Sequence, residues 1–144
     1  MKYYYFAYGS NMNHEQMKSR CPTASFLGRG KLKGYKFVYD GYSVTRDGAV
    51  ANVIKANGYV TEGALFEVDD ACIKNLDHYE GSPKSYQRKV VLVEDDTGKS
   101  YHAFIYLREP QKLGQPSDEY RNVILKGARE CGLSEEYIKD YIEV

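Results

Sequence analysis

Residues 2–17 read KYYYFAYGSNMNHEQM, and the stretch changes character abruptly at Gly9. Before that glycine, residues 2–7 are rich in β-prone side chains with almost no polar alternation, which is typical of a central, buried strand. After it, Asn13 is a suitable helix cap, and a glutamine follows three residues later, as in a capping box. The stretch therefore predicts a buried strand, a tight polar turn and a short helix that ends before Pro22.

The rest of the chain predicts further strands and three more helices. We expect strands at residues 32–39, 49–55, 59–68, 87–94 and 100–107. The last two flank the sequence DDTG, which is a good hairpin signal, and the glycine at position 63 marks a bulge or a close backbone approach. Helices should start at Asp69 or Asp70, Ser117 and Ser134. Several consecutive strands with a hairpin indicate an antiparallel or mixed sheet that curls or closes.

The length, net charge and apolar runs of the chain bear on its domain organisation and on which kinds of partner it could bind. A chain of 144 residues is large enough for one domain with a proper core. The formal net charge is zero and the isoelectric point is about 6.8, so bulk charge gives no support to binding of nucleic acids or anionic membranes. No apolar run approaches the roughly 20 residues that span a bilayer, and the N-terminal stretch lacks the pattern of a signal peptide.

The cysteines and acidic residues give no sign of a metal site or a disulfide framework. Cys21, Cys72 and Cys131 lie far apart in the sequence, form no CxxC pair and are odd in number. We therefore expect them to be core side chains of a protein in the reducing cytoplasm. There is no HExxH motif and no Asp-rich calcium loop, so no metal cofactor is expected.

The turn after the first strand has the composition of an anion site. Backbone N–H groups of Gly9, Ser10 and Asn11 would point into the space before the helix, where they could hold a carboxylate or an oxyanion. The plainer interpretation is a turn that merely ends the strand, and these residues alone favour it. The chain also has 15 tyrosines, a few of which could line a polar pocket.

Glu80 has an unusual predicted position, at the end of the helix that should stop at Gly81. A carboxylate there faces the negative end of the helix macrodipole, and Tyr79 and Tyr86 could shield it from water. Both effects raise the pKa of a carboxyl group towards neutrality, as a general base requires. The alternative is a solvated glutamate at a helix end.

Ser10 is a weaker candidate for a nucleophile. The G-x-S-x-G elbow of α/β-hydrolases fails here, because the flanking positions are Tyr8 and Met12. The histidines at positions 14, 78 and 102 have no spacing that supports a catalytic triad. A serine hydrolase remains an alternative that labelling with a fluorophosphonate would test.

Three motifs together resemble the γ-glutamylcyclotransferase family. They are YFAYGSN at residues 5–11, LDHYEGSPKSYQRKVV at 76–91 and PSDEYRNVILKGARECGLSEEY at 116–137, in this order over nearly the whole chain. The resemblance implies an α+β fold, a small, mostly antiparallel or mixed β-barrel with helices packed around it. It also implies a single domain over residues 1–144.

The resemblance further implies an enzyme without metal or organic cofactor that cyclises the γ-glutamyl group of small amides to 5-oxoproline and releases an amine. It places the catalytic glutamate on Glu80. It places the substrate contacts on Tyr5, Phe6, Ala7, Tyr8, Gly9, Ser10, Asn11, Tyr86 and Tyr120.

The sequence leaves open whether the protein is catalytic, which substrate it takes and which partners it has. The same scaffold could instead be a non-catalytic module that binds a small carboxylate. The family's glutathione-specific and γ-glutamylamine branches read YGSL and YGTL, so Asn11 points to the branch acting on γ-glutamyl amino acids. The loop at residues 39–47 could shape the side of the pocket that faces the amine. We expect a small-molecule γ-glutamyl substrate as partner, no nucleic acid and no membrane, and a homodimer is possible.

Overall fold

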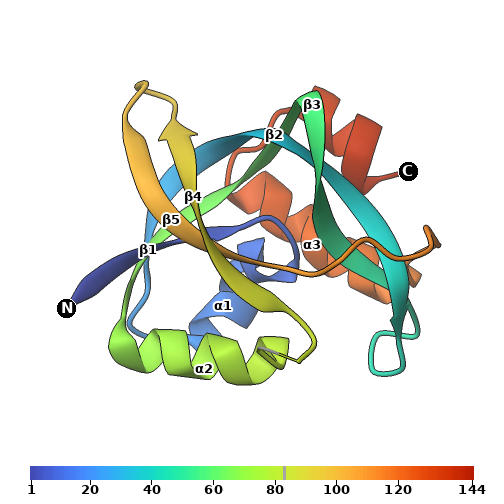
Figure 1. The fold of residues 1–144 in the computed structure, drawn as a ribbon, viewed down its shortest axis with the longest axis horizontal. Helices are drawn as coiled ribbons and strands as arrows, with labels where there is room; N and C mark the ends of the chain where they lie inside the picture. The colour runs from blue at the N-terminus through green and yellow to red at the C-terminus, as the bar shows by residue number, and fades with distance from the viewer. Residues whose placement is uncertain (83) are drawn as a thin grey trace.

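The computed structural model describes residues 1–82 and 84–144 and shows a closed five-stranded barrel (Figure 1). The strands are β1 (Lys2–Ala7), β2 (Ser25–Ser43), β3 (Gly48–Asp69), β4 (Gln87–Asp95) and β5 (Ser100–Leu107). They follow the order β1-β3-β2-β4-β5 around the barrel. Every pair is antiparallel except β1 with β5, which is parallel. The expected α+β fold with a mixed, mostly antiparallel barrel is confirmed.

Helices pack around this barrel. They are η1 (Ser10–Met12), α1 (His14–Arg20), α2 (Asp70–Glu80), α3 (Asp118–Glu130), α4 (Glu135–Tyr137) and η2 (Ile138–Ile142, a π-helical turn). In Figure 1, α1 and α2 lie together below the barrel, whereas α3 lies under the arch that β2 and β3 form. None of the helices in the described residues has both the length and the apolar character to cross a bilayer.

The helix starts follow the sequence because short polar side chains cap them. Each cap accepts a hydrogen bond from the backbone N–H three residues on, which typically stabilises a helix by about 1 kcal/mol. The caps are Asn13, Asp69, Ser117 and Ser134. At the other end of α2, Gly81 adopts a left-handed conformation with φ of 65° and stops the helix as expected.

Two predicted strands, at residues 49–55 and 59–68, are in fact one. β3 runs through both, and its antiparallel pairing with β2 continues past a register shift between Lys33 and Tyr35. Gly34 and Gly58 both have φ of 84° at this irregularity. Glycine tolerates that conformation, so the ribbon bends there without breaking, whereas a sequence pattern treats Gly58 as a strand end.

Two glycines allow close packing next to the turn that follows β1. A Cβ atom on Gly63 would collide with the Ala7 carbonyl oxygen and the Phe6 ring, which confirms the close backbone approach expected at Gly63. A Cβ atom on Gly127 of α3 would collide with the backbone of Asn13. The strand end and the start of α1 are therefore held tightly between β3 and α3.

The expectation that no cysteine forms a disulfide is wrong. Cys21 and Cys72 are joined by a disulfide across 51 residues of sequence, and it links the end of α1 to the first turn of α2. Sequence spacing gave no hint of this, because the pairing depends on which helix ends the barrel brings together. Cys131 is a free, buried thiol, as expected of a core side chain.

Candidate active site

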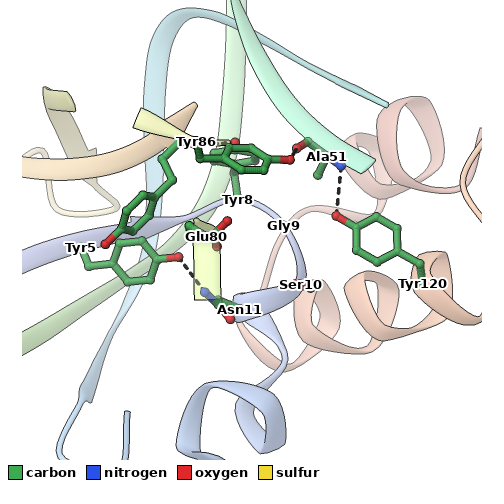
Figure 2. Close-up of a pocket in the computed structure, with 10 residues that line it drawn as sticks. Tyr5, Tyr8, Gly9, Ser10, Asn11, Ala51, Glu80, Tyr86 and Tyr120 are labelled. Atoms are coloured by element: carbon green, nitrogen blue, oxygen red, sulfur yellow. Dashed lines mark hydrogen bonds between the residues drawn. The ribbon is translucent and has the colours of Figure 1, made fainter. Parts of the chain in front are cut away.

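A cavity lies where β1 runs into η1, and most of its wall is aromatic or polar (Figure 2). Side chains and backbone from β1, η1, α2, β3, β5 and α3 meet there. The lining residues are Tyr5, Tyr8, Gly9, Ser10, Asn11, Ala51, Glu80, Tyr86, Tyr106 and Tyr120. Segments that are far apart in the sequence therefore share one small polar space.

The turn after β1 presents backbone donors at the edge of this cavity. The first hydrogen bonds of η1 run from the Met12 N–H to the Gly9 carbonyl and from the Asn13 N–H to the Ser10 carbonyl, each 3.0 Å long. The N–H groups of Gly9, Ser10 and Asn11 precede these bonds and have no acceptor within the helix. Such groups at the start of a helix favour an anionic oxygen.

The turn is held in place by contacts on both sides. The Asn11 side-chain amide donates to the Tyr5 hydroxyl at 3.0 Å. A Cβ atom on Gly9 would lie 3.2 Å from the Cβ of Ala51, so the glycine lets the turn pack closely against β3. The backbone donors are thus fixed relative to the cavity before any ligand binds.

Glu80 is the last residue of α2 and lines the cavity near Tyr8 and the turn after β1 (Figure 2). Burial raises the pKa of its carboxyl group, although the nearby guanidinium groups of Arg20, Arg46 and Arg108 act in the opposite direction. None of the ion pairs in the described residues includes Glu80. A carboxyl group with a raised pKa and no direct ion pair is suited to accept and return a proton.

Two tyrosines are anchored on the backbone of a single residue of β3. The Tyr86 hydroxyl donates to the Ala51 carbonyl at 2.8 Å, and the Ala51 N–H donates to the Tyr120 hydroxyl at 3.0 Å (Figure 2). The Tyr120 hydroxyl accepts this bond, so its own proton stays available for a ligand. Burial raises the pKa of Tyr120 to about 12 and that of Tyr86 still further, so both phenols are neutral near pH 7.

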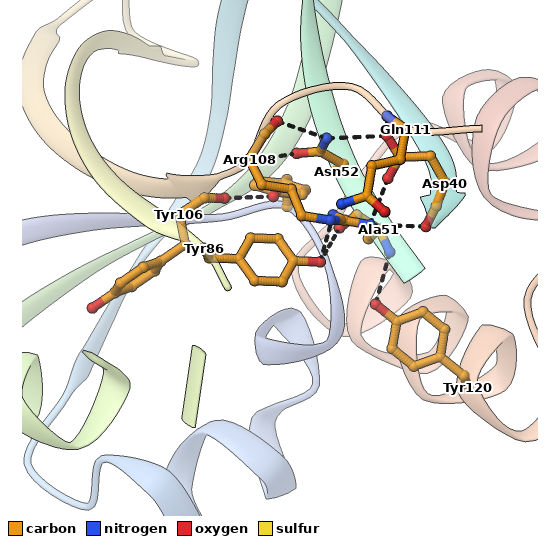
Figure 3. A network of polar contacts seen from close by, with 9 residues as sticks. Asp40, Ala51, Asn52, Tyr86, Tyr106, Arg108, Gln111 and Tyr120 are labelled. Atoms are coloured by element: carbon orange, nitrogen blue, oxygen red, sulfur yellow. Dashed lines mark hydrogen bonds and ion pairs between the residues drawn. The ribbon is translucent and has the colours of Figure 1, made fainter. Parts of the chain in front are cut away.

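A buried ionic network stands behind Tyr86 (Figure 3). Arg108 donates to the Tyr86 hydroxyl at 2.9 Å and forms an ion pair with Asp40 at 2.6 Å. The Asp40 carboxylate also accepts hydrogen bonds from the Asn52 side chain and the Gln111 N–H, at 3.2 and 3.0 Å. Arg108 therefore has a compensated charge and a fixed position, and it fixes Tyr86 in turn.

The cavity opens into a wider space that we call the outer cleft. The two share Ser10, Glu80, Tyr86 and Tyr120. The remaining residues that line the outer cleft are Arg20, Tyr42, Ser43, Thr45, Arg46, Val50, His78, Tyr79, Gly81, Lys84, Ser85, Arg108 and Gln111. The turn between β2 and β3 thus forms part of its wall, next to the inner cavity.

The predicted site residues divide into two groups. Phe6 and Ala7 do not reach the cavity; both are almost fully buried in the hydrophobic core of the barrel. All the other predicted residues line the cavity. The sequence reasoning missed Tyr106, which shares strand β5 with other core residues, and the arginines of the outer cleft, which carry no local signal.

The structure also bears on the alternative chemistries. The Ser10 hydroxyl accepts a hydrogen bond from the Gln16 side chain at 2.7 Å, and no histidine among the described residues is hydrogen-bonded to it. Within residues 1–82 and 84–144, no group of three or more His, Cys, Asp or Glu side chains is arranged to hold a metal ion.

Similarity to known proteins identifies the family of this chain. A model of the AIG2-like family matches residues 60–141, more than half of the chain, so this is an AIG2-like protein. The chain is 30% identical to gamma-glutamylcyclotransferase of Homo sapiens and 32% identical to that of Mus musculus. Each match covers 92% of this chain and 73% of the relative. A solved structure described as gamma-glutamyl cyclotransferase superposes with a TM-score of 0.92 at 28% identity, over 97% of this chain and 86% of that one.

This chain belongs to the γ-glutamylcyclotransferase family. The resemblance to this family that the sequence indicates is thus confirmed. Membership supports a general function of the γ-glutamylcyclotransferase type.

Proposed function

We propose that this protein cyclises a γ-glutamyl amide to 5-oxoproline, releases the amine, and uses Glu80 as general base and acid. The observation that supports this most is the position of Glu80. Its carboxyl group has a pKa raised by burial and lies in the same small cavity as the N–H groups that begin η1. The names of the relatives describe the same chemistry.

The reaction needs proton transfer and a folded-back substrate. The α-amine of the glutamyl group attacks its own γ-carbonyl, and a carbon–nitrogen bond forms as the ring closes. Glu80 takes a proton from this amine and then gives a proton to the leaving nitrogen as the original amide bond breaks. Both bonds involve one substrate molecule, so a small cavity that keeps it folded contributes much of the rate.

Two further sets of groups in the same cavity would bind the glutamyl head. The N–H groups of Gly9, Ser10 and Asn11 donate to an anionic oxygen, either the α-carboxylate or the oxygen that gains charge at the γ-carbon. The Tyr120 hydroxyl donates its proton to the substrate, because it already accepts from Ala51. The Tyr86 hydroxyl already donates its proton to the Ala51 carbonyl. Its ring therefore serves mainly as a fixed part of the cavity wall.

Substitution of Glu80 tests the proposed role. We expect Glu80→Gln to lower kcat for 5-oxoproline formation from γ-glutamyl-alanine at least 100-fold, the order of magnitude for loss of a general base. Mass spectrometry of 5-oxoproline measures this. Binding of γ-glutamyl-alanine, followed by calorimetry, should change little, because the amide has nearly the shape of the acid.

The matched control is Glu136→Gln, at an exposed glutamate of α4. It should leave the rate unchanged. A Glu80→Gln variant with the turnover of the wild type would refute the role of Glu80. Binding of 5-oxoproline without turnover of any γ-glutamyl amide would instead favour a binding module.

A further inference from the structure

The outer cleft carries an excess of positive charge. Among its described lining residues, four are cationic and Glu80 is the single acid. The cations are Arg20, Arg46, Lys84 and Arg108. Since Asp40 pairs with Arg108 from behind, and Glu80 offsets one further charge, two positive charges remain without a compensating carboxylate. This imbalance is local, because the whole chain has a formal net charge of zero.

Arg20 and Arg46 are the two guanidinium groups of the outer cleft that form no direct ion pair among the described residues. Within the described residues neither lies within 4.0 Å of a carboxylate. Each instead donates to a neutral amide: Arg20 to the Asn11 side-chain oxygen at 3.1 Å, and Arg46 to the Gln16 side-chain oxygen at 2.9 Å. Each leaves other N–H groups of its planar fork for a ligand.

The same contacts hold the two arginines near each other on one wall. The Gln16 side-chain amide donates to the Asn11 side-chain oxygen at 2.9 Å, so a continuous chain of hydrogen bonds runs from Arg20 through Asn11 and Gln16 to Arg46. Their guanidinium groups also stack on aromatic rings, Arg20 on Tyr79 at 4.5 Å and Arg46 on Tyr120 at 5.1 Å. Burial lowers the pKa of Arg20, the Glu80 carboxylate acts in the opposite direction, and the charge of Arg46 lowers the pKa further.

Arg20 and Arg46 repel each other, and the one nearby carboxylate, Glu80, offsets only part of their combined charge, so a further anion beside them would be stabilised. The inner cavity already offers backbone N–H groups for the glutamyl head, and the outer cleft is the space left for the part of the substrate beyond the scissile amide. A guanidinium group matches the geometry of a carboxylate. The wall therefore has the chemistry to bind carboxylates of the leaving portion.

We propose that the leaving portion is an acidic amino acid, so that this protein acts on γ-glutamyl dipeptides that end in glutamate or aspartate. The inference rests on the proposed function. It assigns Arg20 and Arg46 as specificity-determining residues that bind the two carboxylates of the leaving amino acid, and the exposed Lys84, which also lines the cleft, adds to the positive field.

The test compares two substrates of nearly equal shape, γ-glutamyl-glutamate and γ-glutamyl-glutamine. For the wild type we expect kcat/KM to be at least tenfold higher for γ-glutamyl-glutamate, with a difference that shrinks as salt is added. Arg46→Gln and Arg20→Gln should each remove most of this preference by lowering the rate for the acidic dipeptide. Arg46→Lys keeps the charge and should keep part of the preference.

The control variant is Lys126→Gln, which removes an exposed positive charge of α3 outside the outer cleft and should keep the full preference. Equal kcat/KM for the two dipeptides in the wild type would overturn the inference while leaving the cyclotransferase proposal intact. So would a preference that survives in both glutamine variants.

Failure of the proposed function itself has a different signature, namely no 5-oxoproline from either dipeptide. In that case calorimetric binding of the same two compounds still decides the charge preference. Tighter binding of γ-glutamyl-glutamate by the wild type, but not by Arg46→Gln, would support an acidic ligand. Equal affinities, or no binding of either compound, would overturn it.

Discussion

At the scale of single residues, Glu80 is the residue in which the fold most directly determines the proposed chemistry, because the end of α2 places its carboxyl group in the cavity. A helix C-terminus is an unfavourable place for a carboxylate, and burial adds to the cost of its charge. The nearby arginines reduce this cost without forming a direct ion pair, so they leave the carboxyl group able to exchange a proton. Such a residue contributes to function more than to stability.

The raised pKa of Glu80 gives a prediction for stability against pH. Folding favours its protonated form, so this contribution to stability is fully present below the unfolded-state pKa of about 4.3 and is lost as pH rises through the raised folded value. In the Glu80→Gln variant the side chain does not ionise, so its stability does not decrease in this way as pH rises. We therefore expect the free energy of unfolding of the variant, relative to wild type, to increase as pH rises through this window.

Urea denaturation at a series of pH values measures this difference. A difference between Glu80→Gln and wild type that stays constant from acid to neutral pH would contradict a raised pKa. The exposed control Glu136→Gln should give a nearly flat line.

At the scale of elements, strands β2, β3 and β5 meet at the network around Asp40 and Arg108 (Figure 3). The side chains of Asp40 and Arg108 are 1% and 10% exposed, so this ion pair is buried, and breaking it would leave an uncompensated charge. Because Arg108 also donates to Tyr86, the same network sets the position of a cavity wall.

We predict that Asp40→Asn destabilises the fold by about 3–5 kcal/mol, the cost of removing one partner of a buried ion pair. It should also raise KM for the γ-glutamyl substrate, because Tyr86 loses its fixed support. The matched control is Asp118→Asn, where Asp118 is 93% exposed in its pair with Arg121. That change should cost about 1 kcal/mol or less. Urea denaturation curves with the same shift for both variants would contradict the prediction.

Local signals predicted the helices and β1 well, because caps, stop glycines and a continuous apolar strand act within a few residues. The same signals split β3 at Gly58, since a pattern cannot tell a strand end from a bend with positive φ. The cavity was predictable only in part: Glu80 and the turn at Gly9 lie in recognisable motifs. Arg20 and Arg46 reach the outer cleft through tertiary structure and have no such signal.

At the scale of the whole molecule, the barrel brings together segments from both ends of the chain. The disulfide between Cys21 and Cys72 links α1, which carries Arg20 and Gln16, to α2, which carries Glu80. Gly127 lets α3 pack directly on the start of α1, and Tyr120 of the same helix reaches the cavity. The walls of the site thus come from elements that are tightly connected, and the site is organised before a ligand binds.

One measurement tests the central claim, that the cavity promotes attack by the substrate's own amine. Purified protein is incubated with γ-glutamyl-glutamate or γ-glutamyl-alanine in heavy-oxygen water, and the products are identified by mass spectrometry. We expect 5-oxoproline without heavy oxygen, formed in equal amount with the released amino acid. Free glutamate that has gained heavy oxygen would show hydrolysis by water and would contradict it.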